Sequence, residues 1–245
     1  MRTTCFLLIL LLPLCGLIAQ NTPEEYLKWL SPLPENICIQ TPEAIAKWSD
    51  SLNPLIDRMK GVLLQENNDW EDAVANGKFN MAMADPDGPA AARGRSLNEK
   101  MQELQQKVNV SFLKIWTVYR DAKVNLIIKY DEPFNELTRE YTEAQTAGRN
   151  TAELKERIRA MEMDRCEEMA HIRRDYLNAY RGFLYEYMPT FVRQNEIKDE
   201  VNRIQYESFE FRTRYGAWLE HIMKFAEELR LVFDDAPDSG AIDMS

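Results

Sequence analysis

The chain has 245 residues, 45% of them hydrophobic, which is enough for one or two domains with a substantial core. It is acidic: 40 Asp and Glu residues against 30 Lys and Arg residues give a formal net charge of −10. Because phosphate binding depends on clustered Lys and Arg, this balance argues against nucleic acid or an anionic lipid surface as the main partner.

The N-terminal segment has the layout of a secretory signal peptide. A positive residue stands near its start, an apolar run covers 6–14, and the segment ends on the small residue Ala19. That run is too short to span a bilayer, and no later segment reaches the ~20 apolar residues that a membrane helix needs. We therefore predict that residues 1–19 are cleaved after Ala19, which leaves a periplasmic or secreted protein with no membrane span. A lipoprotein anchored at Cys15 is the less favoured alternative, because Leu14 stands where a small residue is normally found.

Proline and capping signals divide the rest of the chain into segments. Residues 22–25, Thr-Pro-Glu-Glu, form a capping box with proline at the first helical position and predict a short helix. Two prolines within 31–34 then end it. We therefore expect a short helix and a Pro-rich segment over 20–40, a helical bundle domain over 41–234, and a disordered acidic tail over 235–245.

Strand signals are nearly absent, whereas apolar residues recur every three or four positions. This spacing predicts a helix over about 41–74, in which Pro54 causes a kink or a restart. The turn residues at 85–89 break the chain. A second long helix is expected over about 91–147, and Pro133 should bend it or restart it.

The C-terminal half predicts two further helices. Gly148 marks a turn, and Asn150 is placed to cap the next helix, which Pro189 should end. Apolar residues over 197–232 then alternate by four and three without interruption, with Ser208 as the one polar member. This pattern is typical of a five-heptad a/d seam and predicts one continuous helix.

These patterns together predict an all-α fold. Short turns between long helices favour antiparallel neighbours, so we expect an elongated antiparallel bundle of about four long helices, plus the short N-terminal helix. The heptad period favours coiled-coil-like packing with shallow crossings.

Glu168 and His171 are the candidates for a metal site. Their E-x-x-H spacing places a carboxylate and an imidazole on one side of a helix. Di-iron bundles use two such motifs and two further carboxylates, and this chain contains one motif. Asp164 and Asp175 fall on the same stripe, away from the apolar stripe. A solvated acidic face is therefore favoured over a metal site.

Cys38 and Cys166 are the cysteines that remain after the predicted cleavage. They can form one disulfide, which would tie the Pro-rich segment to the bundle, or they can remain two free thiols. Cys166 also lies between Met163 and Met169, and such soft ligands suit Cu(I). Methionine is an ordinary core residue, however, and core packing is the favoured interpretation.

Aromatic residues are densest in the last hairpin. Tyr185, Tyr206 and Phe209 fall outside the seams. They predict either a second buried face or a partner surface, and internal packing is the favoured of the two.

No motif assembles catalytic chemistry. The two histidines, His171 and His221, are too few for a three-histidine zinc site, and no Gly-rich phosphate loop is present. We therefore expect no cofactor and a non-enzymatic, exported helical-bundle protein of the cell envelope or exterior. Its role would be structural or in protein–protein interaction, through a protein partner or self-association. The alternative is an extracytoplasmic bundle that binds a metal or a small ligand between its helices.

Overall fold

The computed structural model describes residues 42–213 and 216–231, and 88% of these are helical. The four α-helices are α2 (Pro42–Asn76), α3 (Pro89–Thr146), α4 (Ala152–Gln205) and α5 (Gly216–Leu231). The prediction of an all-α fold is confirmed. The predicted signal peptide, short N-terminal helix and acidic tail lie outside the described residues. Over the described ranges, none of the helices is both long and apolar enough to cross a bilayer.

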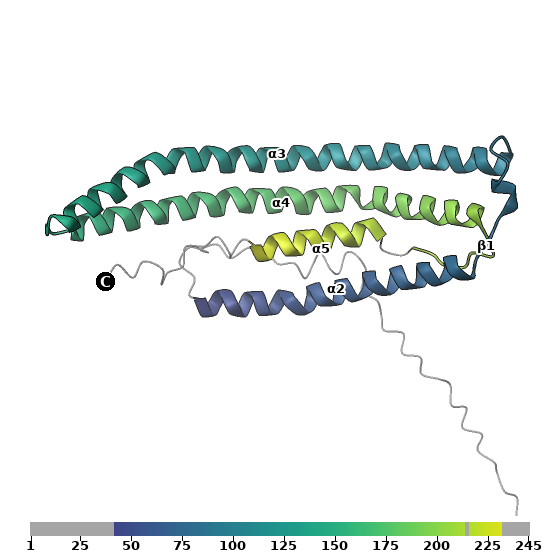
Figure 1. The fold of residues 1–245 in the computed structure, drawn as a ribbon, viewed down its shortest axis with the longest axis horizontal. Helices are drawn as coiled ribbons and strands as arrows, with labels where there is room; N and C mark the ends of the chain where they lie inside the picture. Colours follow the sequence, from purple (N-terminus) through teal and green to yellow (C-terminus); the bar gives the residue numbers. More distant parts are fainter. Residues whose placement is uncertain (1–41, 214–215, 232–245) are drawn as a thin grey trace, which may run out of the picture.

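The long helices lie along a common direction (Figure 1). α3 and α4 run antiparallel, side by side, over most of their length, and they form the most extensive helix contact. α5 packs against α4 on one side and α2 on the other. The layers therefore follow the order α3, α4, α5 and α2, so one side of α3 faces away from the other described helices.

The turn between α3 and α4 forms as the sequence predicts. Gly148 adopts a φ of 64°, a left-handed conformation that glycine reaches without a steric penalty. The N–H of Arg149 donates to the carbonyl oxygen of Ala144 at 2.9 Å, which satisfies one of the last carbonyls of α3. Asn150 Oδ1 accepts from the N–H of Ala152 at 3.0 Å, but the N-cap residue of α4 is Thr151, one position later than predicted.

A short irregular segment ties the other end of the helices together. β1 (Lys78–Phe79) pairs antiparallel with β2 (Tyr206–Glu207), and a 3-10 turn, η2 (Met81–Met83), follows β1. Asn80 Nδ2 donates to the carbonyl oxygen of Ile204 at 2.9 Å. These contacts join the link between α2 and α3 to the end of α4. Strands of two residues are too short to leave a periodic signal in the sequence.

The predicted end of a helix at Pro189 is wrong. α4 continues through Pro189, as α2 does through Pro54 and α3 through Pro133. A proline inside a helix removes one backbone hydrogen bond. On either side of Pro189, Tyr187 and Phe191 are buried, and this burial stabilises the helix across the proline. The C-terminal end of α3 bends toward α4 (Figure 1).

The predicted continuous helix over 197–232 is also wrong. α4 ends at Gln205, the chain is non-helical over 206–213, and α5 begins at Gly216 and lies back along α4. Ser208, the one polar member of the seam, has a φ of 63° within the reversal. Seam residues on both sides of the break are nevertheless buried: Ile197, Trp218, Ile222, Phe225 and Leu229. The heptad pattern thus identified core residues correctly. The pattern arises because two separate helices, α4 and α5, both face the same core, and not because one helix is continuous.

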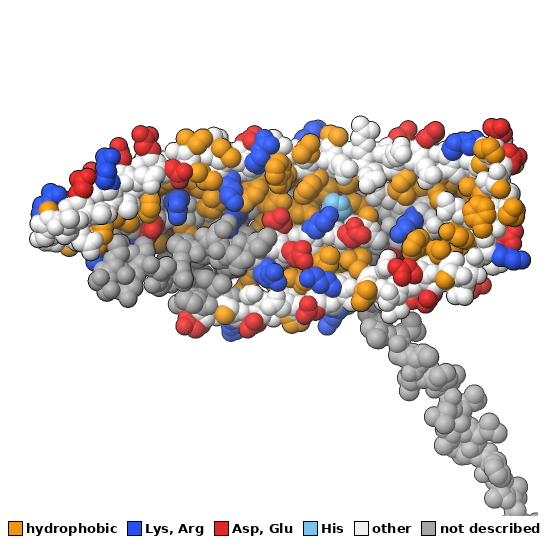
Figure 2. All heavy atoms as spheres, viewed as in Figure 1, with side chains coloured by type: hydrophobic (Ala, Val, Ile, Leu, Met, Phe, Trp, Pro, Cys, Tyr) orange, Lys and Arg blue, Asp and Glu red, His pale blue; other side chains and the backbone are white. Residues whose placement is uncertain are grey.

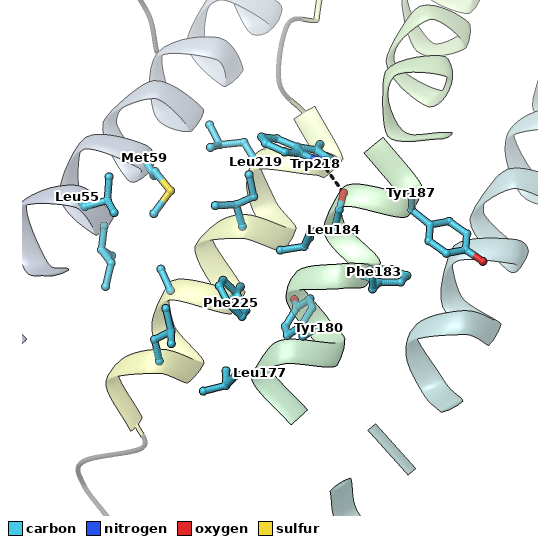
Figure 3. Close-up of a cluster of buried hydrophobic side chains, with 14 of the residues drawn as sticks. Leu55, Met59, Leu177, Tyr180, Phe183, Leu184, Tyr187, Trp218, Leu219 and Phe225 are labelled. Carbon is cyan, nitrogen blue, oxygen red and sulfur yellow. Dashed lines mark hydrogen bonds between the residues drawn. The ribbon is translucent and has the colours of Figure 1, made fainter. Parts of the chain in front are cut away.

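The main core lies where α2, α4 and α5 meet (Figure 3). Met59 of α2, Leu184 of α4 and Leu219 of α5 are completely buried. Trp218 Nε1 donates to the carbonyl oxygen of Leu184 at 3.4 Å, which links α5 to the backbone of α4. Burying each large apolar side chain contributes about 1.5–3 kcal/mol, so this cluster accounts for much of the stability of the fold.

Candidate functional site: the exposed apolar face of α3

Apolar side chains gather on the outer side of α3. Among the described residues, seven of the twelve exposed large hydrophobic side chains lie on α3 between positions 110 and 128. They are 40–72% exposed: Val110, Leu113, Trp116, Val118, Val124, Ile127 and Ile128. Figure 2 shows apolar side chains on the visible face of α3 along the middle of the helix.

Most of these side chains share one face. At about 100° per residue, five of them fall within a sector of about 100°. This set is named the α3 outer face here: Val110, Leu113, Val124, Ile127 and Ile128. It extends for about 27 Å at a rise of 1.5 Å per residue. The buried residues of the same helical stretch, Val108, Leu126 and Tyr130, lie on another side of α3, and Ile127, at the edge of the outer face, also lines a cavity between α3 and α4.

The centre of the α3 outer face is polar. Thr117 and Arg120 continue its spacing between the two apolar ends. The Arg120 guanidinium donates to Asp121 Oδ1 at 2.8 Å and lies 5.3 Å from the ring centroid of Trp116. The face therefore consists of two aliphatic patches separated by one charged and aromatic cluster, and Trp and Arg are residue types enriched at protein interfaces.

The inner side of α3 is held firmly on α4. The rings of Tyr119 and Tyr176 stack with centroids 4.3 Å apart, and Phe112 lies 4.8 Å from Tyr180. The hydroxyl of Tyr187 is 2.5 Å from Ser111 Oγ. These ring contacts hold α3 in place on α4, so the α3 outer face lies on a helix that is already ordered.

The exposed α3 outer face was not predicted, although the sequence contains a signal for it. The apolar spacing was assigned to one core stripe, which the structure buries against α4. Val110, Leu113, Val124 and Ile127 form a second set at spacings of three, eleven and three on the same helix. A helix with one packed neighbour and two apolar stripes leaves one stripe exposed.

Glu168 and His171 are the predicted metal candidates, and the structure gives the surroundings of each side chain. Glu168 accepts a hydrogen bond from the Tyr130 hydroxyl at 2.8 Å and pairs with the ammonium group of Lys129, both on α3. These two hydrogen bonds hold the pKa of Glu168 below its usual value. His171 is exposed. Nowhere in the described ranges do three or more His, Cys, Asp or Glu side chains converge as a metal site would require.

Cys166 is disulfide-bonded. Cys38 lies outside the described residues, so its pairing with Cys166 stays a prediction. Cys166 and Met169 line a cavity of about 250 Å³ between α3 and α4. A disulfide sulfur is not a thiolate, so Cys166 lacks the form that would bind Cu(I) alongside Met163.

A larger cleft lies between α2 and the C-terminal third of α4. Its volume is about 1390 Å³. Charged residues of both signs line it: Arg58, Glu66, Asp69, Arg93, Arg193, Glu196, Asp199, Glu200, Arg203, Glu210 and Arg212. No single motif marks these residues, because segments more than 100 positions apart in the chain build the walls.

The cleft also has buried polar groups. Asp199 is 7% exposed, and its Oδ1 accepts from the backbone N–H of Thr213 at 2.8 Å. Thr213 is 8% exposed, and its hydroxyl has no hydrogen-bond partner among the described residues. The cleft therefore combines arginines and carboxylates with one buried hydroxyl that can bond to a ligand or to water.

His221 lies in an aromatic environment beneath α3. Its ring centroid is 5.0 Å from that of Phe191, 6.0 Å from Phe183 and 6.1 Å from Phe112. Burial, together with the charge of Lys224, lowers the pKa of His221 to about 4. The imidazole is therefore neutral at pH 7 and packs, partly buried, against these aromatic rings.

The three aromatics outside the predicted seams differ in exposure. Phe209 is buried, and its ring stacks on that of Tyr206 with centroids 6.1 Å apart. Tyr185 is 41% exposed. The favoured prediction of internal packing thus holds for Phe209, whereas Tyr206 is partly buried and Tyr185 lies at the surface.

No protein-family model matches the chain, and comparisons with curated proteins and with solved structures found no similar protein. Function is therefore inferred from the surfaces and cavities of the chain itself.

Proposed function

We propose that this chain is a non-enzymatic, exported helical-bundle protein that acts in protein–protein interaction or structural support in the cell envelope or exterior. The observation that carries the proposal is the α3 outer face. Exposed apolar patches rimmed by polar residues are typical of interaction sites, and the α3 outer face has two such patches, one on either side of Trp116 and Arg120. Its position on a helix that already packs firmly on α4 means that binding needs little reordering of the chain.

The chemistry of the face indicates a helical partner. Aliphatic residues spaced by three and four along a helix suit coiled-coil-like packing against another amphipathic helix. Arg120 and Trp116 at the centre supply the residue types that dominate binding energy at interfaces. We propose the same coiled-coil-like packing for the contact of α3 with α4.

Export is proposed from the N-terminal residues 1–19, which have the charge and apolar pattern of a signal peptide. N-terminal sequencing of the protein isolated from its source should begin at Gln20. A chain that still begins at Met1, or one that carries lipid on Cys15, would overturn this part of the proposal.

The experiment that tests the interaction compares affinity capture by wild type and a double variant, Leu113→Glu with Val124→Glu. Both side chains are about half exposed, so the variant should keep its helical circular dichroism. Leu64→Glu is the matched control, because Leu64 is 63% exposed on α2. The proposal expects a near-stoichiometric partner or self-complex with wild type and Leu64→Glu, lost with the double variant. Equal capture by all three proteins would overturn it.

The cleft between α2 and α4 supports a second candidate, the binding of a small polar ligand. The observation is the Thr213 hydroxyl, which is buried without a partner among the described residues in a cleft lined by both arginines and carboxylates. This lining suits a zwitterion such as an amino acid. A panel of amino acids should then raise the melting temperature of wild type and have a smaller effect on Thr213→Val. No shift with any of them would count against this candidate.

A further inference from the structure

We propose that the occupant of the α3 outer face is the same face of a second copy of this chain, packed antiparallel. This inference rests on the proposed function and names the partner of that surface. Three observations carry it: the self-complementary order of residues along α3, the charges beside the face, and the polar layers at its centre.

The order of residues is self-complementary about a point between positions 118 and 119. In heptad terms, Val110, Thr117 and Val124 take a positions, and Leu113, Arg120 and Ile127 take d positions. In an antiparallel pair, each a residue packs beside a d residue of the other helix. Val110 then meets Ile127 of the second copy, Leu113 meets Val124, and Thr117 meets Arg120. Four apolar layers thus enclose two polar ones.

The flanking charges favour the same arrangement. In this register the exposed Lys114 lies beside the exposed Asp121 of the second copy, and the two-fold axis repeats the pair. Trp116 lies beside Lys123 of the second copy, where the ammonium group can approach the ring. Neither Lys–Asp pair forms if the helices are parallel.

The polar centre selects against the parallel alternative. Parallel helices in register would place Arg120 against Arg120, and this like-charge contact disfavours the pairing. The antiparallel pairing places each Arg120 beside Thr117, which offers a hydroxyl acceptor. One polar position within an apolar seam is a common device for specifying register and orientation.

Cross-linking of the full mature chain, without reducing agent, tests the register. Val110→Cys and Ile127→Cys are prepared separately and mixed in the presence of a short bis-maleimide. The antiparallel pair predicts cross-linked dimer in the mixture. Little is expected from either variant alone, because identical positions of the two copies then lie about 26 Å apart along the axis. Leu64→Cys on α2 is the control and should give none. Dimer from Val110→Cys alone, or no dimer from the mixture, would overturn the proposal.

Sedimentation equilibrium over a range of concentrations distinguishes self-association of this chain from the more general proposal that the α3 outer face binds a protein partner. Wild type should associate reversibly to a dimer, and the double variant Leu113→Glu with Val124→Glu should remain monomeric. If wild type is monomeric throughout but captures a different protein that the double variant loses, self-association is overturned and the proposed interaction function stands. If wild type is monomeric and capture is unaffected by the double variant, both are overturned.

Discussion

The reversal of chain direction between α4 and α5 predicts that Gly216→Ala, which adds one methyl group, destabilises the protein. Gly216 has a φ of 35°, in the region that favours glycine. A Cβ added there would lie 2.4 Å from Asn195 Oδ1 and 3.0 Å from Thr213 Cγ2. Asn195 is 7% exposed, so its side chain cannot simply swing into solvent. Alanine at this position therefore forces either the backbone or Asn195 to move.

The expected cost follows from these two effects. A left-handed conformation costs an L-residue about 1–2 kcal/mol, and a displaced buried side chain adds on the order of 1 kcal/mol. Gly216→Ala should therefore lower the free energy of unfolding by about 2–3 kcal/mol. Gly182→Ala is the matched control: Gly182 lies inside α4, with nothing within 4 Å of an added Cβ. It should stabilise the protein by up to about 1 kcal/mol, because alanine is the better helix former.

Urea unfolding followed by far-UV circular dichroism measures both variants against wild type. Opposite signs for the two substitutions are expected. If Gly216→Ala stabilised the protein as Gly182→Ala does, position 216 would be an ordinary helix interior. The chain would then be helical through the reversal, as the heptad pattern over 197–232 suggests.

Three further predictions concern the core, the partly buried His221 and the disulfide. Leu219→Ala should lower the free energy of unfolding by about 2–5 kcal/mol, because Leu219 is completely buried. Leu64→Ala, at an exposed site, should lower it by less than about 0.5 kcal/mol. Similar losses for the two variants in urea unfolding would contradict the burial of Leu219 in the core. His221 favours its neutral form when folded, so its contribution to stability is complete above pH 6.5 and is lost as the pH falls toward about 4, by at most about 3 kcal/mol. Over that window His221→Phe should lose less stability than wild type, and equal losses would show that the pKa of His221 is not lowered in the folded protein. Reduction of the mature protein should add the mass of two hydrogens, and the increase should be absent in Cys38→Ser; an increase that persists there would exclude the pairing of Cys38 with Cys166.

The helices were largely predictable because their stability comes from periodic burial, and periodicity is readable in a sequence. The turn at Gly148 was predictable too, since glycine there meets a local steric need. Pro189 misled the prediction, because the burial of Tyr187 and Phe191 is a tertiary effect that local rules omit. The reversal at 206–213 carries no proline, and heptad spacing continues on both sides of it.

The candidate sites were less predictable than the fold. Glu168 and His171 share a helix face in the sequence, but the hydrogen bonds of Glu168 to Lys129 and Tyr130 depend on which helix packs beside it. The cleft with Thr213 is built from distant segments, so no local pattern could mark it. The α3 outer face was visible as a second apolar stripe, but its exposure depends on how many helices pack around α3.

The most direct test of the central claim is the accessibility of the α3 outer face in the native setting. Leu113→Cys is treated with a bulky hydrophilic maleimide, once in the fraction where the protein accumulates and once as dilute purified protein. Leu64→Cys serves as the control for reagent access. If a partner covers the α3 outer face, Leu113→Cys should react several-fold more slowly in the native fraction than when dilute, whereas Leu64→Cys should react equally in both. Equal reactivity of Leu113→Cys in the two settings would mean that nothing covers the face, and it would contradict the account.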